Sequence, residues 1–255
     1  MGQEFFEGVR QWVVTHQDMT AKIPVFYYDT TSMTAIYTAA TRQVKKRLPL
    51  RRMHPVELRP GRCLVAFSAF EYRSCDIEPY NEVSIAFPIT FGRPQLPWLS
   101  AAWQAARRRI NAYVWQLPVS TESARASGVA LYGYPKFLAE IEFEKAERRT
   151  TCHLTSDDEP ILALTGKILS TRPQKRSRIR TYSVLEGTPL LANMVFNPLA
   201  MAYSNDKHAA LVQTGTRHPI CKALRALELS EYPIHYQYSP VNQSILFPAR
   251  NLLDK

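Results

Sequence analysis

The sequence is poor in glycine and contains no long apolar run. Its 9 glycines stand against 18 prolines, a balance that excludes a collagen-like chain and argues against long flexible linkers. Every apolar run is interrupted within about ten residues, whereas a helix that crosses a bilayer needs about 20. We therefore expect a chain without membrane segments and without a membrane partner.

The four cysteines are spaced irregularly and form no C-x-x-C pair. The first residues include Glu4 and Glu7, where a secretory signal peptide would be basic and then apolar. Disulfide bonds persist in oxidising compartments and are rare in the cytoplasm. These features together predict a cytoplasmic protein with reduced thiols.

Several motifs that carry chemistry are also missing. A phosphate-binding loop is excluded because Gly166-Lys167 is followed by Ile168, where Ser or Thr is required. The G-x-S-x-G turn of many hydrolases and the H-E-x-x-H zinc motif are absent. The six histidines are scattered, and the adjacent Cys152 and His153 would point to opposite faces of a strand. We predict neither a metal site nor a cofactor.

Positive charge is in excess, with 32 Lys and Arg residues against 22 Asp and Glu and a net charge of +10. Such a charge attracts nucleic acids, anionic membranes or anionic small molecules. The basic clusters mostly lack the interleaved aromatic side chains of nucleic-acid binding surfaces, so we interpret them as solvated surface and expect no nucleic-acid partner. These clusters are Lys45–Arg47, Arg51-Arg52, Arg107–Arg109 and Lys175–Arg180.

The chain is long enough for one large domain or two small ones. Its 255 residues are 45% hydrophobic and 21% charged, as in globular proteins. No Gly/Ser linker and no internal repeat divides it, and we interpret the basic stretch Thr171–Arg180 as an exposed loop or strand edge. We predict a single domain over residues 1–255.

Periodicity predicts many β-strands with few helices between them. Apolar side chains at helical spacing predict an amphipathic helix over residues 3–16 and shorter helices over Ala39–Arg47, Trp98–Ile110 and Pro219–Leu227. Ile23–Tyr28 contains a proline, which indicates an edge strand or ordered coil. No βαβ rhythm of about 30 residues is present, so we predict an α+β, β-rich fold. The remaining predicted strands are Met33–Tyr37, Cys63–Tyr72, Val83–Phe87, Ala112–Leu117, Ala139–Phe143, Arg149–Thr155, Ile161–Leu169 and Ile234–Tyr238.

The most informative segment is Gly128–Glu140, GVALYGYPKFLAE, in which a turn precedes Lys136 at the start of an apolar strand. Lysine is rarely buried, yet neighbours such as Tyr134 and Phe137 are strongly apolar. Burial removes water from an ammonium group and favours the neutral amine, which is a nucleophile. The residues alone leave a second interpretation open, in which the stem of Lys136 lies on the aromatic rings while its ammonium group stays in water.

The chain resembles the acetoacetate decarboxylase family over nearly its full length. The resemblance depends most on Tyr134-Pro135-Lys136 after a glycine-containing turn and on Tyr80-Asn81-Glu82 upstream. It extends to Pro24–Tyr37 and to the segments LVAFSAFEYRS, TRHPICKALRAL and ILFPARNL. The resemblance implies a mostly antiparallel curved sheet or barrel, which we expect over residues 63–170, enclosing an apolar cavity with the helices outside it.

The resemblance also implies a mechanism without a cofactor. Lys136 would attack the carbonyl carbon of a small keto acid and form a Schiff base, whose protonated imine accepts the electrons released when carbon dioxide leaves. Glu82 matches an acidic active-site residue of the family and would steer the proton or the substrate. Considered without the resemblance, Glu82 would be interpreted as an exposed glutamate at the start of a strand. The family forms homo-oligomers, so the resemblance implies a homo-oligomer. The aromatic N-terminal segment would suit a subunit interface, and packing on its own barrel explains it equally well.

Three positions depart from the family pattern. Phe137 follows the motif lysine where decarboxylases have a second lysine, Thr30 replaces an arginine suited to a substrate carboxylate, and Ser68 replaces a glutamate. Loss of the arginine removes a charge-assisted anchor and argues against acetoacetate itself as the substrate. Three functions stay open: a lyase that decarboxylates a β-keto acid, an aldolase or dehydratase for keto acids, and a protein that binds such a molecule without turnover.

Alternation along the strand after Glu82 predicts the form of the pocket. Glu82 shares a face with Ser84 and Ala86, and this alternation should end or bulge at Pro88. We expect a buried Lys136 with no carboxylate at salt-bridge distance, and the Glu82 carboxylate roughly 4–8 Å from the Lys136 nitrogen, within reach through one water. The candidate substrate-binding residues are Thr30, Ser68, Ser84 and three aromatic residues that are also typical of a plain core: Phe70, Trp115 and Tyr132.

Overall fold

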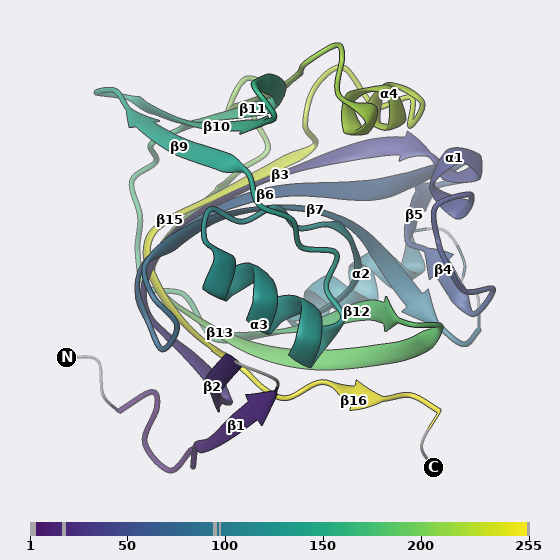
Figure 1. Cartoon of the computed structure of the whole chain (residues 1–255). Coiled ribbons are helices and arrows are strands. Elements are labelled where there is room, and N and C mark those ends of the chain that lie inside the picture. The colour runs from purple at the N-terminus through teal and green to yellow at the C-terminus, as the bar shows by residue number, and fades with distance from the viewer. Residues whose placement is uncertain (1–3, 17–18, 94–95, 97, 254–255) are drawn as a thin grey trace.

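The computed structural model describes residues 4–16, 19–93, 96 and 98–253 (Figure 1). In this part of the chain no helix is long and apolar enough to cross a bilayer. The helices are α1 Thr41–Lys45, α2 Leu99–Ala106, α3 Glu122–Tyr132 and α4 Pro219–Arg225. The strands are β1 Trp12–His16, β2 Met19–Ile23, β3 Val25–Ala40, β4 Met53–Pro55, β5 Glu57–Arg59, β6 Arg62–Cys75, β7 Tyr80–Phe91, β8 Arg109–Gln116, β9 Glu140–Lys145, β10 Arg149–Ser156, β11 Glu159–Lys167, β12 Ser177–Leu185, β13 Thr188–Ser204, β14 Ala210–Thr214, β15 His235–Leu246 and β16 Arg250–Asn251.

Seven strands close into a barrel in the order β3-β6-β7-β8-β12-β13-β15, with β15 pairing again with β3. Every pairing around this barrel is antiparallel except that of β8 with β12. Long strands and bulges make closure possible: β3 has 16 residues and β13 has 17, and register shifts interrupt the pairings of β15 with both. The predicted β-rich, mostly antiparallel barrel is confirmed, but strands outside residues 63–170 complete its wall.

A second sheet, in the order β14-β11-β10-β9, lies outside the barrel over the wall formed by β3, β6 and β7 (Figure 1). The side chains between the two layers are fully buried, among them Val65, Phe67 and Ile85 of the barrel and Cys152 and Leu154 of the second sheet. Much of the apolar core therefore lies between this wall and the second sheet.

The inner face of the barrel is lined differently from the outer face. Alternation along β3, β6 and β7 places Thr34, Ala66, Ser68 and Ser84 on the inside. These side chains stay partly exposed, whereas their outward-facing neighbours are fully buried. The lumen therefore keeps space that water can enter. Hydroxyl-bearing and small side chains line this part of the lumen together with apolar ones of the same alternation, such as Ile36, Leu64 and Phe70.

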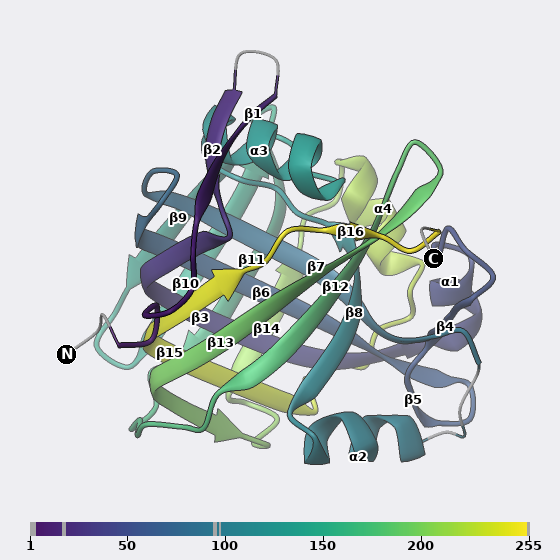
Figure 2. The same ribbon diagram turned by 90° about the horizontal axis from the view of Figure 1, so that it is seen from below.

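The helix α3 lies across one end of the barrel, as Figures 1 and 2 show together. The periodicity of the sequence does not predict it, because Gly128 and several polar residues lower the helix propensity of this segment. Burial stabilises it instead: Tyr132 of α3 belongs to an apolar cluster with three tyrosines of the barrel strands, Tyr27, Tyr72 and Tyr80. At this end of the barrel, tertiary packing and not local propensity decides the secondary structure.

The helix predictions have mixed outcomes. The helices α1, α2 and α4 lie within the predicted ranges and are confirmed. The helix over residues 3–16 is wrong in the described part, because a turn there precedes β1, which forms an antiparallel hairpin with β2. The β-branched run Val13–Thr15 favours a strand, and Phe5 and Phe6 pack beside Phe26 from the turn.

Two strand predictions also need correction. Ile23–Tyr28 is not an edge strand, because β3 begins at Val25 and lies between β15 and β6. The strand β7 continues through Pro88 to Phe91. The register shift in its pairing with β8 falls earlier, between Ile85 and Ala86, and the extra residue lies on β8. Pro88 lies where β7 faces β8 on one side, and its carbonyl accepts a hydrogen bond from the Val56 amide on the other.

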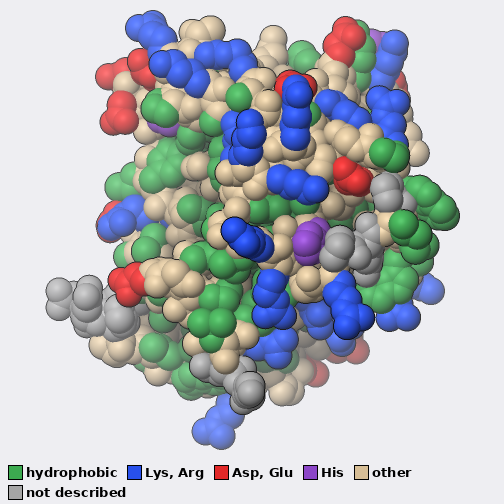
Figure 3. All heavy atoms as spheres, turned by 90° about the vertical axis from the view of Figure 1, so that its right-hand side faces the viewer, with side chains coloured by type: hydrophobic (Ala, Val, Ile, Leu, Met, Phe, Trp, Pro, Cys, Tyr) green, Lys and Arg blue, Asp and Glu red, His purple; other side chains and the backbone are tan. Residues whose placement is uncertain are grey.

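The basic clusters lie at the surface, as the sequence indicates. Arg42, Lys45 and Lys46 of α1 and its C-terminal end are exposed, and so are Arg51 and Arg52 before β4. Figure 3 shows Lys and Arg side chains spread over this face with few acidic side chains among them. The basic stretch before β12 is mainly loop, and β12 begins only at Ser177.

Candidate functional site

A tight turn after α3 sets the path of the chain that carries Lys136. Gly133 ends the helix with a left-handed backbone (φ 58°), a conformation that glycine adopts without strain. Its amide donates to the Val129 carbonyl at 3.0 Å, and the Tyr134 amide donates to the Gly128 carbonyl at 3.1 Å, which satisfies two carbonyl groups at the helix end. Lys136 follows in an irregular segment between α3 and β9, and not at a strand start as predicted.

Two β-bridges of Val119 bring the segment of Lys136 next to Glu82. Val119 forms an antiparallel bridge to Glu82 of β7 and a parallel bridge to Leu138 on its other side. The Val119 amide donates to the Phe137 carbonyl at 3.0 Å, so the segment after Lys136 is held parallel to the segment at Val119. Glu82 and Lys136 are 54 residues apart in the sequence, and this three-segment contact places them side by side.

Lys136 and Glu82 form a buried ion pair, with 2.9 Å between Lys136 Nζ and Glu82 Oε2. Their side chains are 5% and 9% exposed. The burial of Lys136 is as predicted, but the predictions of no carboxylate at salt-bridge distance and of a 4–8 Å separation are wrong. Removing one charge from water costs several kcal/mol unless a partner compensates it, and Glu82 is that partner. Glu82 is therefore not an exposed glutamate.

Tyrosine side chains surround the pair. Tyr72 donates a hydrogen bond to Glu82 Oε1 at 3.3 Å, and Lys136 Nζ lies 5.3 Å from the centre of the Tyr80 ring. The rings of Tyr27 and Tyr80 each lie 4.6 Å from that of Tyr72. Burial, and next the negative charge of Glu82, raise the pKa of Tyr27 and Tyr72 well above its usual value. Burial, the neighbouring phenol of Tyr27 and the charge of Glu82 also raise the pKa of Tyr80. These phenols stay protonated at neutral pH.

Gly128 gives the Lys136 side chain its place against α3. A Cβ at position 128 would lie 2.4 Å from Lys136 Cδ and 2.5 Å from Cε, closer than non-bonded carbon atoms approach each other. The side chain of Lys136 therefore crosses the helix at its glycine. The sequence signal was present, since Gly128 opens the motif segment, but only the fold connects it with Lys136.

The predicted substrate-binding residues fall into two groups. Phe70 pairs with Glu82 across β6 and β7, and Ser68 pairs with Ser84 one step further along the inner face. Ser68 also shares a hydrogen bond of 2.8 Å with Thr34. These side chains continue from Glu82 along the inner face of the barrel into the lumen.

The other three lie elsewhere. Trp115 stacks on Phe87 with 5.3 Å between ring centres, on the outer face of the barrel, so the prediction that it lines the pocket is wrong. Tyr132 is buried among the tyrosines and stacks on Tyr134 at 5.4 Å between ring centres. Thr30 is 1% exposed, and its hydroxyl oxygen has no hydrogen-bond partner among the described residues. Thr30 is thus covered by packing and does not open to the lumen.

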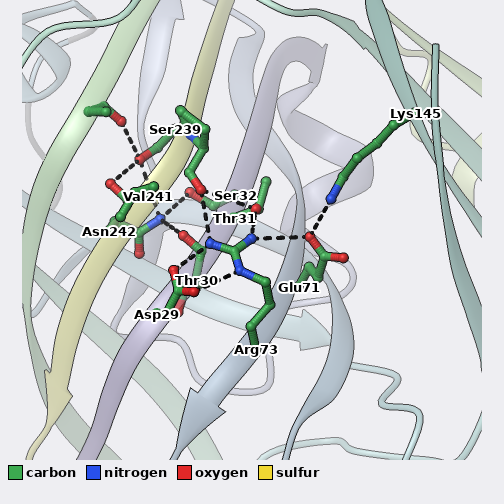
Figure 4. A network of polar contacts seen from close by, with 12 residues as sticks. Asp29, Thr30, Thr31, Ser32, Glu71, Arg73, Lys145, Ser239, Val241 and Asn242 are labelled. Carbon is green, nitrogen blue, oxygen red and sulfur yellow. Dashed lines mark hydrogen bonds and ion pairs between the residues drawn. The ribbon is translucent and has the colours of Figure 1, made fainter.

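On the outer side of the wall, a polar network fixes the strand segment that carries Tyr72 (Figure 4). Arg73 contacts both carboxylate oxygens of Asp29 on β3 and donates to the Pro240 carbonyl of β15 at 3.1 Å. Glu71 accepts from Arg73 at 3.2 Å and from Lys145 of β9 at 2.9 Å. The two residues beside Tyr72 are therefore anchored to three other strands, while Tyr72 itself points inward.

The arrangement can move one proton without creating net charge. A proton that passes from Lys136 Nζ to Glu82 Oε2 leaves a neutral amine beside a neutral acid, and both states are electrically balanced. The neutral amine can attack a carbonyl carbon. Among the described residues, no group of three or more His, Cys, Asp and Glu side chains is placed to hold a metal ion.

The chain is similar to known proteins in sequence and in fold. A family model described as acetoacetate decarboxylase matches residues 13–193. A search of curated proteins found no match.

Among solved structures, an acetoacetate decarboxylase from Legionella pneumophila superposes with a TM-score of 0.64 at 13% identity, over 99% of this chain and 96% of the other. A second acetoacetate decarboxylase superposes with a TM-score of 0.61 at 14% identity, over 90% of this chain and 89% of the other. The enduracididine biosynthesis enzyme MppR in complex with pyruvate superposes with a TM-score of 0.61 at 14% identity, over 89% of both chains. At these identities the likeness concerns the fold.

Proposed function

Since the chain belongs to the acetoacetate decarboxylase family, we propose that it is a lyase that forms a Schiff base between Lys136 and a small keto acid. The observation that supports this proposal best is the ion pair of Lys136 with Glu82, buried inside the barrel end and surrounded by protonated tyrosines. A solvated lysine outside the barrel would have argued against it. No cofactor is needed, because the protonated imine itself accepts electrons.

The proposed reaction begins with the proton that the ion pair shares. Glu82 accepts it from Lys136, and the neutral amine adds to the carbonyl carbon of the substrate. The protonated Glu82 then returns the proton to the hydroxyl group of the adduct, which leaves as water. The product is an iminium cation opposite an ionised Glu82, so the charges of the original ion pair are restored at the same place.

Carbon–carbon bond cleavage follows from the electron demand of the iminium group. In a β-keto acid the bond to the carboxylate breaks, its electron pair moves into the iminium group, and carbon dioxide and a neutral enamine result. A proton taken from solvent and delivered to the enamine carbon regenerates the iminium cation, which water hydrolyses to the ketone product and the free lysine. Glu82 is close enough to handle this second proton.

A second candidate is an aldol-type or dehydrating reaction of a keto acid through the same imine. Thr30 leaves this candidate open, because it provides no positive charge for the carboxylate of acetoacetate and its hydroxyl group is covered. The same enamine carbon that takes a proton after decarboxylation can instead attack an aldehyde. One solved structure of MppR contains the condensation product of pyruvate and imidazole 4-carboxaldehyde, a compound that joins a keto acid to an aldehyde.

Reductive trapping tests the proposal. Acetoacetate or pyruvate with borohydride should attach a reduced adduct, which peptide mass spectrometry should locate at Lys136. Lys136→Ala should abolish the adduct, while the control Lys167→Ala, a lysine paired with Asp206 at the surface, should leave it unchanged. Carbon dioxide release from short β-keto acids then separates decarboxylation from the aldol-type reaction. Failure of a panel of keto acids to give any adduct at Lys136 would favour a protein that binds without turnover.

A further inference from the structure

Tyr72 is the described tyrosine that donates a hydrogen bond to the carboxylate paired with Lys136. Its hydroxyl group donates to Oε1 of Glu82 at 3.3 Å, while Lys136 contacts Oε2 at 2.9 Å. The two oxygens of one carboxylate are thus divided between a phenol and an amine. Any change in how strongly the phenol donates alters the carboxylate that exchanges a proton with Lys136.

Three aromatic rings pack against the ring of Tyr72. It packs between the rings of Tyr27 and Tyr80 and stacks on Phe70 with 5.7 Å between ring centres. Its backbone neighbours Glu71 and Arg73 are anchored in the network outside the wall (Figure 4). The direction in which the hydroxyl group points is therefore fixed before a substrate binds.

The phenol acts as a hydrogen-bond donor throughout. Burial and the nearby charge of Glu82 raise the pKa of Tyr72 well above its usual value, so it does not ionise at physiological pH. A donor stabilises an ionised carboxylate more than a neutral carboxylic acid, because the bond to a charged acceptor is the stronger one. Tyr72 therefore favours the ionised form of Glu82.

We propose that Tyr72 is a positioning residue that holds Glu82 ionised and aimed at Lys136, and thereby sets the pH below which the pair becomes doubly protonated and inactive. The proposal deepens the proposed function and rests on it for its catalytic meaning. The proton that moves is the one shared by Lys136 and Glu82, and the proton of Tyr72 stays on its own oxygen. Once the imine has formed, the same hydrogen bond keeps Glu82 ionised opposite the iminium cation.

Tyr72→Phe tests this with Tyr80→Phe as a matched control. Both changes remove one hydroxyl group and keep the ring, both residues are 4% exposed, and both lie in one cluster. The Tyr80 hydroxyl, however, pairs with Tyr27 at 3.4 Å and has no hydrogen bond to Glu82. At 3.3 Å the bond from Tyr72 to Glu82 is long for one that involves a charged group, so we expect its loss to shift the titration by about one pH unit, tenfold in proton affinity.

Carboxyl carbon NMR of protein labelled in its glutamates reads this shift directly, with the Glu82 signal assigned by Glu82→Gln. In Tyr72→Phe the titration midpoint of Glu82 should rise by about one pH unit, and in Tyr80→Phe, whose hydroxyl makes no hydrogen bond to Glu82, it should shift by much less. The acidic limb of cyanoborohydride trapping with pyruvate should move by the same amount and in the same direction.

The two proposals fail separately. Unchanged Glu82 midpoints in Tyr72→Phe, or equal shifts in both variants, would overturn the role of Tyr72 even if wild-type protein forms the adduct. A shift confined to Tyr72→Phe together with no adduct in any variant would support the hydrogen bond and overturn the Schiff-base function. Melting temperatures of both variants check that each is folded under the conditions of the titration.

Discussion

Gly128→Ala is expected to disturb the site from the helix side. A methyl group at position 128 would lie 2.4 Å and 2.5 Å from two carbons of the Lys136 side chain and 3.1 Å from its nitrogen. The lysine chain is flexible and can turn away, but turning away removes its nitrogen from Glu82 in a place where both side chains are almost fully buried. The steric clash is therefore converted into an electrostatic cost.

The magnitude follows from two opposing contributions. Replacing glycine by alanine inside a helix stabilises it by up to about 1 kcal/mol. Separating a buried ion pair costs about 3–5 kcal/mol, because it leaves a charge without compensation. The net loss should be about 2–4 kcal/mol, which lowers the melting temperature of a chain of this size by roughly 5–15 °C. The rate of borohydride trapping at Lys136 should fall at least about tenfold, because losing about 1.4 kcal/mol of the interaction between the lysine and its site corresponds to a factor of ten.

A background without the lysine provides the control. In Lys136→Ala the obstructing side chain is absent, so adding Gly128→Ala should raise stability by about 0.5–1 kcal/mol through helix propensity alone. Calorimetry of the four proteins, wild type, both single variants and the double variant, measures this reversal of sign. If Gly128→Ala raises the melting temperature of the otherwise wild-type chain and leaves trapping intact, the close passage of Lys136 over α3 does not constrain the site.

Further predictions concern the ion pair and the network behind it. Glu82→Gln should reduce turnover far more than imine formation. Without the carboxylate, burial favours the neutral amine of Lys136, which attacks without a proton acceptor, whereas protonation of the enamine loses its carrier. Equal losses in matched trapping and turnover assays would make Glu82 a purely structural residue. Lys136→Met should destabilise the chain by about 3–5 kcal/mol in denaturant titration, and adding Glu82→Gln should recover most of that loss, whereas additive effects would contradict the coupling. Arg73→Met should cost about 1–2 kcal/mol, because its contacts with Asp29 and the Pro240 carbonyl are partly screened by solvent at 32% exposure, and an unchanged melting temperature would show that the network does not brace β6.

Local sequence features determined much of the architecture. Alternating residues in the strands around Phe67 and Ile85 and the helices beginning near Leu99 and Pro219 were predictable, because strand and helix periods are properties of neighbouring residues. The segment around Tyr134-Pro135-Lys136, with Glu82 upstream, identified both members of the central pair. The resemblance of these two segments to the family carries this information, whereas residue type and spacing alone left both residues with a second interpretation.

Tertiary structure decided the features that depend on residues far apart in the chain. The helix α3 forms because the barrel end buries it, and the aromatic segment before residue 16 becomes a hairpin because its side chains find partners on the barrel. The contact between Lys136 and Glu82 was not predictable, because it depends on the bridges of Val119 to both segments. The sequence by itself therefore indicated Lys136 and Glu82, through the family resemblance, and only the closed barrel determined the distance between them, since that distance is set by backbone bridges between segments far apart in the chain.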